Sequence, residues 1–183
     1  MTSAARKPLL IALLGPPGSG KTHLGRRIRA SLGFAFDETE KQLLERYGSR
    51  EAFVRSKDQA LAELERDLRT RLASSSVPVV IEATGHSDGP MLGRIAHDFP
   101  MLWIKVYADR ELCVARVRSR ERGRNLSNDA DQAGSFHDFW LREVAPRFAF
   151  DLELVNDGRS DADLLQALAE RVKLSTSPRD ADG

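Results

Sequence analysis

Residues 9–22 read LLIALLGPPGSGKT, in which six consecutive apolar residues run into a glycine-rich turn that ends in lysine and threonine. A continuous apolar run is typical of a strand that is buried on both faces of a parallel sheet. The turn matches the pattern G-x-x-x-x-G-K-[ST] at every required position, and a helical stretch from about Lys21 to Leu32 follows it. Strand, turn and helix together predict a phosphate-binding loop.

Each position of this loop has a chemical task. Glycines allow backbone N–H groups to converge on phosphate oxygens, and the helix N-terminus adds a favourable dipole. Lys21 is expected to reach the β- and γ-phosphates of a nucleotide, and the Thr22 hydroxyl is expected to ligate Mg²⁺. A chance glycine turn is the alternative, and the flanking strand and helix argue against it. The residues predicted to hold the nucleotide are Gly15, Pro16, Pro17, Gly18, Ser19, Gly20, Lys21 and Thr22.

The rest of the chain alternates between apolar strands and helices. Four further strands are expected at about 34–36, 77–81, 101–107 and 150–155. Helices are expected at about 39–74, with a break near 47–49, and at 87–98, 110–119, 136–147 and 161–172. This order predicts an α/β fold in three layers, with a five-stranded, mainly parallel sheet flanked by helices. Residues 1–174 are expected to form a single domain, and residues 175–183 a disordered tail.

Length and composition exclude several classes of protein. The 183 residues carry 28 Lys and Arg against 27 Asp and Glu, so the net charge of +1 gives no general field for a polyanion. The single cysteine cannot form an internal disulfide, which suits a reducing compartment. No apolar run approaches the roughly 20 residues of a membrane span, and the run at 9–14 is too short for a signal peptide. A cytoplasmic monomer or homodimer is expected.

The chain resembles small P-loop kinases of the shikimate kinase, gluconate kinase and adenylate kinase group. The likeness extends over residues 9–172 as an order of elements, and the phosphate loop is its most specific part. The N-K-x-D segment of GTPases is absent, and the chain is too short for an AAA+ module with a helical lid domain. The resemblance implies an ATP- and Mg²⁺-dependent kinase that moves the γ-phosphate to a hydroxyl-bearing small molecule or nucleotide. It also implies an acidic acceptor site and an arginine-bearing lid.

An acidic cluster, residues 37–40, follows the second expected strand. Residues 34–48 resemble the shikimate kinase stretch F-x-D-T-D-x-x-I-E-x-x-x-G, with Glu38 and Glu40 in place of its two aspartates. A carboxylate here would orient or deprotonate the acceptor hydroxyl, or help to hold Mg²⁺ through water. Asp37 is the favoured candidate because it lies closest to the end of the strand. The alternative is that these residues only stabilise the N-terminus of the next helix.

The third expected strand runs into Glu82. Residues 79–82 read VVIE and resemble a Walker B segment with glutamate in place of aspartate. A carboxylate just beyond a buried strand can bind a metal through water or orient the nucleophile, although strands also often end in a charged residue at the solvent boundary. Residues 82–85 resemble the D-A-T-G/N stretch of gluconate-kinase-like and polynucleotide-kinase-like proteins. Residues 84–86 are therefore candidates for the acceptor pocket.

Arginines are concentrated after the fourth expected strand, at Arg110, Arg116, Arg118, Arg120, Arg122 and Arg124. Arg116, Arg120 and Arg124 lie four residues apart and would share one helix face. The resemblance implies a lid at about 119–135 that folds over ATP and places these guanidinium groups against phosphoryl oxygens during catalysis. A solvated helix face and an RNA-binding patch are the alternatives. The near-neutral net charge and the lack of aromatic residues in this segment argue against nucleic acid as a partner.

The sequence departs from shikimate kinases in the acceptor site. Those kinases place an F-R pair and a glycine triplet against their carboxylate substrate. Here Ala62 stands at the position of that arginine, with Arg55 as a displaced candidate, and residues 83–85 read ATG in place of the triplet. The acceptor therefore stays open. Two other functions also remain, a kinase of nucleic-acid ends and a non-catalytic ATP-binding regulatory module.

Overall fold

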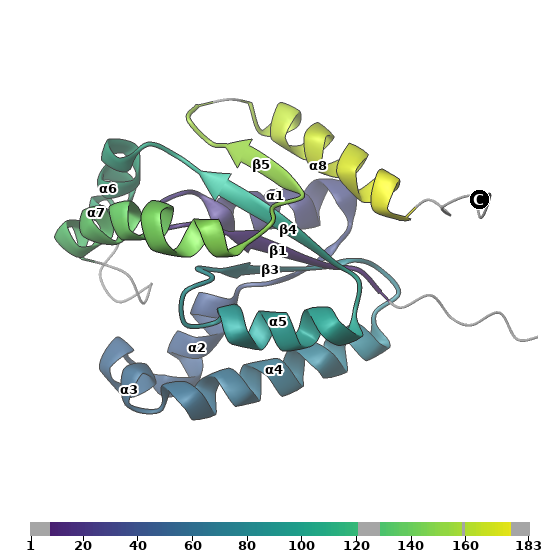
Figure 1. Ribbon diagram of the computed structural model, residues 1–183, viewed down its shortest axis with the longest axis horizontal. Helices are drawn as coiled ribbons and strands as arrows, with labels where there is room; N and C mark the ends of the chain where they lie inside the picture. Colours follow the sequence, from purple (N-terminus) through teal and green to yellow (C-terminus); the bar gives the residue numbers. More distant parts are fainter. Residues whose placement is uncertain (1–7, 121–128, 159, 177–183) are drawn as a thin grey trace, which may run out of the picture.

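The computed structural model describes residues 8–120, 129–158 and 160–176. At its centre lies a five-stranded sheet in the order β2-β3-β1-β4-β5, in which every strand pair is parallel (Figure 1). The strands are β1 (Leu10–Leu14), β2 (Ala35–Asp37), β3 (Val79–Ala83), β4 (Met101–Tyr107) and β5 (Leu152–Val155). The predicted α/β class and the five-stranded parallel sheet are confirmed.

Helices cover both faces of the sheet and so produce three layers (Figure 1). They are α1 (Lys21–Leu32), α2 (Thr39–Tyr47), α3 (Arg50–Arg55), α4 (Lys57–Ser74), α5 (Gly89–Asp98), α6 (Arg110–Arg118), α7 (Ala130–Phe139) and α8 (Asp161–Thr176). A π-helical turn (Trp140–Val144) and a 3-10 turn (Ala145–Arg147) continue α7. None of the described helices is both long enough and apolar enough to cross a lipid bilayer.

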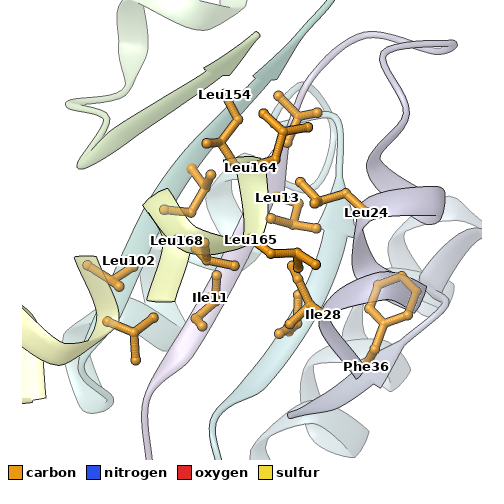
Figure 2. Packing of buried hydrophobic residues seen from close by; sticks show 14 of the residues in the cluster. Ile11, Leu13, Leu24, Ile28, Phe36, Leu102, Leu154, Leu164, Leu165 and Leu168 are labelled. Carbon is orange, nitrogen blue, oxygen red and sulfur yellow. The ribbon is translucent and has the colours of Figure 1, made fainter. Parts of the chain in front are cut away.

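The central strand β1 is buried along its whole length because its side chains alternate between two cores. Ile11 and Leu13 lie in one core with Ile28 of α1 and with Leu165 and Leu168 of α8 (Figure 2). The alternate residues of β1 pack beneath α4 and α5 on the other face. Burial on both faces explains why the sequence reads as a continuous apolar run at this strand.

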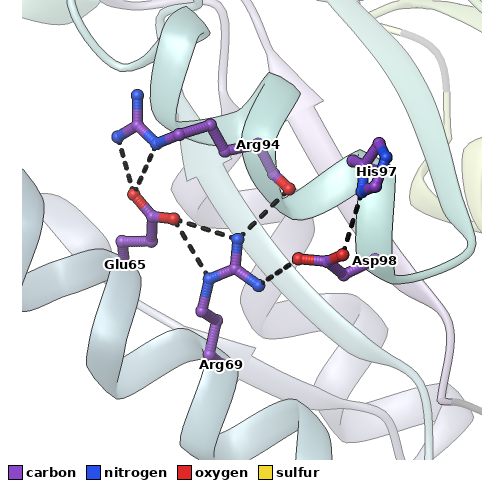
Figure 3. A network of polar contacts seen from close by, with 5 residues as sticks. All are labelled: Glu65, Arg69, Arg94, His97 and Asp98. Carbon is purple, nitrogen blue, oxygen red and sulfur yellow. Dashed lines mark hydrogen bonds and ion pairs between the residues drawn. The ribbon is translucent and has the colours of Figure 1, made fainter.

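A network of ion pairs joins α4 to α5 at the surface (Figure 3). Glu65 of α4 accepts hydrogen bonds from Arg69 one turn later and from Arg94 of α5, the latter at 2.6 Å. Arg69 in turn donates to Asp98 at the end of α5, at 2.6 Å, and Asp98 also contacts His97. Isolated exposed pairs contribute little to stability, but shared partners make a network more effective. The pairing of Glu65 with Arg69 agrees with the helical spacing in the sequence.

Several predicted boundaries are wrong, and the largest differences lie in three helical regions. The helical region at 39–74 breaks at Ser56 as well as at Gly48, so it forms three helices. The helix expected from residue 136 starts at Ala130, because the Asp129 side chain accepts hydrogen bonds from the backbone N–H groups of two residues in its first turn. The last helix, expected to end at residue 172, continues to Thr176.

Candidate active site

The glycine-rich loop lies between the carboxyl end of β1 and α1, at the centre of the sheet edge. Gly18 and Gly20 have φ values of +83° and +96°, a conformation that residues with a side chain rarely adopt. A Cβ atom on Gly15 would lie 2.2 Å from the carbonyl oxygen of Val106, and one on Gly18 would lie 2.3 Å from that of Cys113. Both conformation and space therefore require glycine in this loop.

The polar groups of the loop fit a phosphate group. Lys21 Nζ donates hydrogen bonds to the carbonyl oxygens of Gly15 and Pro16, at 2.7 and 2.9 Å, which holds the ammonium group over the loop. Burial lowers the pKa of Lys21, and the carboxylates of Glu82 and Glu40 act in the opposite direction. Within the described part of the chain, the buried Ser19 Oγ has no hydrogen-bond partner. A cation and a donor placed in this way can both bind an anionic oxygen.

Glu82 of β3 lies directly against Thr22. Its Oε2 atom accepts a hydrogen bond of 2.5 Å from Thr22 Oγ1, and the residue is only 5% exposed. Burial raises the pKa of Glu82, against the opposing effects of the Thr22 hydroxyl and the Lys21 ammonium group. Mg²⁺ prefers oxygen ligands and usually takes only one or two from protein side chains, alongside phosphate oxygens and water. The Thr22–Glu82 pair therefore fits a Mg²⁺ ion bound next to phosphates.

A cavity of about 860 Å³ extends from the phosphate loop. Its polar end includes Lys21, Thr22, Glu40, Glu82 and Asp88. The three carboxylates in this group lie close enough to Lys21 to raise its pKa, against the effect of burial. The rest of the cavity is bounded largely by helices α2, α3, α4 and α7. This volume is typical of sites for small organic molecules.

Asp37 is not among the residues that line this cavity, although the smaller cavity that it lines shares Glu82 and Asp88 with it. Its Oδ1 forms an ion pair with Arg71 of α4, at 2.9 Å, and its side chain lines a smaller neighbouring cavity of about 380 Å³. Phe36 packs in the core with α1, so the next residue of the strand faces the opposite layer. Glu40 is the member of the acidic cluster that lines the larger cavity with Lys21, whereas Glu38 pairs with Arg26. The structure thus brings Glu40 and Glu82 to the loop and leaves Asp37 beside α4.

We expect Arg71→Met to lower the free energy of unfolding at neutral pH by about 1 kcal/mol. Burial raises the pKa of Asp37, and the Arg71 guanidinium opposes this shift. Without that cation the pKa of Asp37 rises further, so the folded state is penalised while Asp37 is charged. The penalty disappears as the pH falls below about 3.9, where Asp37 is protonated in both states. Chemical denaturation at pH 7 and pH 3 measures the difference.

Arg66→Met is the matched control, because Arg66 lies exposed on the same helix. This control should change stability by less than about 0.5 kcal/mol. If Arg71→Met loses the same stability at both pH values, packing of the Arg71 side chain and not its charge is responsible.

Two of the three predicted lid arginines lie in the described part of the chain. The guanidinium group of Arg116 donates to the carbonyl oxygens of Gly18, at 3.3 Å, and of Asn156, at 3.1 Å. Arg116 therefore holds the phosphate loop to the segment after β5. Arg120 lines the large cavity and contributes to lowering the pKa of Lys21. Arg124 lies outside the described residues, as do residues 121–128 of the predicted lid.

Asp88 is a candidate site residue that sequence reasoning missed. Its carboxylate lines both cavities and accepts a hydrogen bond of 3.1 Å from the Thr84 backbone N–H. Burial raises the pKa of Asp88, and the backbone hydrogen bonds that it accepts oppose this shift. Asp88 directly precedes α5, where aspartate is common as a helix cap, so its sequence position does not single it out. Thr84 and His86, which the sequence suggested, also line the large cavity.

Comparisons with known proteins agree with this geometry. Residues 11–136 match a family model described as an AAA domain, although the length of the chain argued against an AAA+ module with a helical lid domain. A shikimate kinase of Moorella thermoacetica is 28% identical over 171 residues, which cover 89% of this chain and 94% of that protein. The structure of Acinetobacter baumannii shikimate kinase in complex with shikimate has a TM-score of 0.65 at 18% identity, and covers 94% of this chain and 96% of that one. A gluconokinase of Sinorhizobium meliloti gives 0.57 at 20% identity, over 93% and 95%.

Proposed function

Because this chain belongs to the AAA domain family and is an ATP-dependent kinase, we propose that it transfers the γ-phosphate of Mg²⁺-bound ATP to a hydroxyl group of a small organic molecule. The family match covers the phosphate loop and most of the sheet. The observation that carries the proposal is the contact of Thr22 with Glu82 beside Lys21, at one end of a cavity large enough for an acceptor. Nucleotide and acceptor would therefore meet at this end of the cavity.

Catalysis in this site would come from positioning and charge stabilisation. The backbone N–H groups of residues 15–20 would hold the phosphate oxygens, and Lys21 would stabilise the charge that develops on the transferred group. Thr22 and Glu82 would hold the metal, directly or through water. When bound, Mg²⁺ neutralises charge on the phosphate oxygens. Arg116 keeps the loop in place from outside, and Arg120 adds positive charge on the side of Lys21.

We assign to Glu40 the role of binding the acceptor hydroxyl. Its carboxylate lines the cavity and lies near enough to Lys21 and Glu82 to influence the pKa of both. In this position it would orient the hydroxyl and accept its proton as the bond from the acceptor oxygen to the γ-phosphorus forms and ADP leaves. Asp37, the candidate favoured from the sequence, is held by Arg71 in the neighbouring cavity.

Glu40→Gln is expected to lower kcat/KM for the acceptor by about 100-fold, because a general base contributes at least this much, and to leave the KM for ATP unchanged. Steady-state kinetics with each substrate varied in turn measure both values. Glu45→Gln is the matched control, since Glu45 lies exposed on the same helix and pairs with Lys41 outside the cavity. Should Asp37→Asn cause the larger loss, the role belongs to Asp37.

Coupled measurement of ADP release tests the function as a whole. The acceptor panel contains nucleosides, nucleotides, sugars, sugar acids and cyclic polyols, with Lys21→Ala as the inactive reference. The proposal predicts that at least one small acceptor stimulates turnover well above this reference. Stimulation by oligonucleotide 5′ ends alone, with strong salt dependence, would instead indicate a nucleic-acid-end kinase. ATP binding without ADP release under any acceptor would indicate a regulatory module.

A further inference from the structure

The part of the cavity away from the phosphate loop is walled by apolar and aromatic side chains. These residues come from α2, α3, α4 and α7, and we call them the acceptor wall: Leu43, Phe53, Val54, Leu61, Phe136 and Phe139. Val54 is 58% exposed, although isoleucine, leucine and valine side chains in this fold are mostly buried. Together with its five neighbours, Val54 gives this part of the cavity the apolar lining that is common in sites for organic ligands.

Charges on the same part of the cavity cancel. Arg50 and Lys57 contribute two positive charges, and Asp129 and Asp131 contribute two negative ones. Arg50 also donates a hydrogen bond of 2.9 Å to Gln132, so that its guanidinium group joins α3 to α7. Among the described residues, the acceptor end therefore offers no net positive charge to an acidic acceptor. An ion buried there without a dedicated partner would be costly.

Aromatic rings are ordered at the edge of the acceptor wall. The His86 imidazole packs edge-to-face against Phe139, with ring centroids 5.2 Å apart, and against Phe136, at 5.8 Å. The two phenyl rings lie 5.7 Å from each other. Edge-to-face packing of this kind is favourable and fixes the direction of each ring. The cluster thus presents a pre-formed aromatic surface beside Thr84, close to the end of β3.

From the apolar wall, the balanced charges and the ring cluster, we infer that the acceptor is an uncharged alcohol that carries an aromatic ring. This inference rests on the proposed function and narrows its substrate class. The ring would pack against the acceptor wall while the hydroxyl reaches Glu40 at the polar end. A carboxylated polyol would instead place several polar groups against the apolar acceptor wall, where they lose hydrogen bonds to water, and its carboxylate would meet Arg50 and Lys57 already balanced by Asp129 and Asp131.

Acceptor selectivity tests the inference. Nucleosides and phenyl-substituted diols represent the aromatic class, and shikimate, gluconate and cyclohexane polyols represent the non-aromatic one. We expect kcat/KM to be at least about tenfold higher for the best aromatic alcohol, from the area that an aromatic ring buries. Turnover with polyols or polyol acids and none with aromatic alcohols overturns this inference and leaves the proposed function intact. No turnover with any acceptor of the wider panel, nucleotides and sugars included, contradicts the proposed function itself.

Two variants of the acceptor wall give an independent test. Phe139→Ala should raise the KM for the aromatic acceptor about tenfold, and Val54→Ser a few-fold, while kcat and the KM for ATP change little. Val54→Ser keeps the test sound even if Phe139→Ala folds poorly, because Val54 is exposed. Phe34→Ala is the matched control, since Phe34 is a half-buried phenylalanine that packs in the core on the other face of the sheet. An unchanged acceptor KM in both wall variants contradicts the inference.

Discussion

Lys21→Ala is expected to lower kcat by about 1000-fold at saturating ATP and acceptor. The ammonium group is held over the phosphate loop by the carbonyl oxygens of Gly15 and Pro16, where the transferred phosphate would lie. Removing one pre-positioned donor to developing negative charge typically costs a factor of 100 to 1000. The lysine also offsets negative charge on the phosphate oxygens that the metal ion leaves uncompensated. Measurement of ADP release under single-turnover conditions isolates the chemical step.

The control for this substitution is Lys41→Ala. Lys41 lies exposed on α2 and pairs with Glu45 at 3.7 Å, so its loss should change kcat by less than about twofold. The fold should tolerate Lys21→Ala, because burial lowers the pKa of Lys21 and thus disfavours the charged form in the folded state. Activity within tenfold of the wild type, with an unchanged melting temperature, would remove Lys21 from the mechanism.

Glu82→Gln is expected to lower kcat by about 100-fold or more and to raise the Mg²⁺ concentration needed for half-maximal activity. The glutamine oxygen can still accept the hydrogen bond from Thr22, but it supplies no negative charge to a metal ion. Activity measured across a series of Mg²⁺ concentrations separates weaker metal binding from slower chemistry. Glu153→Gln serves as the control, because Glu153 of β5 pairs with Lys105 away from the cavity.

Stability gives a second measure of the same substitution. Since burial raises the pKa of Glu82, the folded state binds this proton more tightly than the unfolded state does. The wild type therefore loses stability as the pH rises above about 4.3, the ordinary pKa of glutamate, and Glu82→Gln does not. The variant should be more stable than the wild type at pH 7, with no such advantage near pH 4. A variant that is both inactive and less stable at pH 7 would indicate a structural role for Glu82.

The phosphate loop and the elements around it were predictable from sequence because their signals are local. An apolar run, a glycine pattern and a helix follow one another without a gap, and α1 begins and ends at the expected residues. The pairing of Thr22 with Glu82 also follows from general rules, because parallel strands bring their carboxyl ends to one edge. The stretch that predicts the fold, from β1 through α1, therefore also contains the nucleotide-binding half of the site.

The acceptor side was harder to predict because it depends on register and on distant contacts. β2 includes Asp37, and because side chains alternate along a strand, this carboxylate faces away from the core that holds Phe36 and meets Arg71 of α4. Leu61 has the same helical spacing as the buried residues Leu64 and Leu68, so the hydrophobic periodicity of the sequence cannot distinguish a residue of the cavity wall from one of the core. The start of α7 depends on a single cap at Asp129, a residue type that is equally common in loops.

The short helix α3 has a consequence for how this enzyme can change. None of its residues is buried, yet Phe53 and Val54 both line the cavity, whereas the phosphate loop follows a strand buried in the centre of the sheet. Folding therefore constrains Phe53 and Val54 less than it constrains the strand before the phosphate loop. Random substitution of Phe53 and Val54 is a natural starting point for directed evolution toward new acceptors, because the nucleotide half of the enzyme would remain intact.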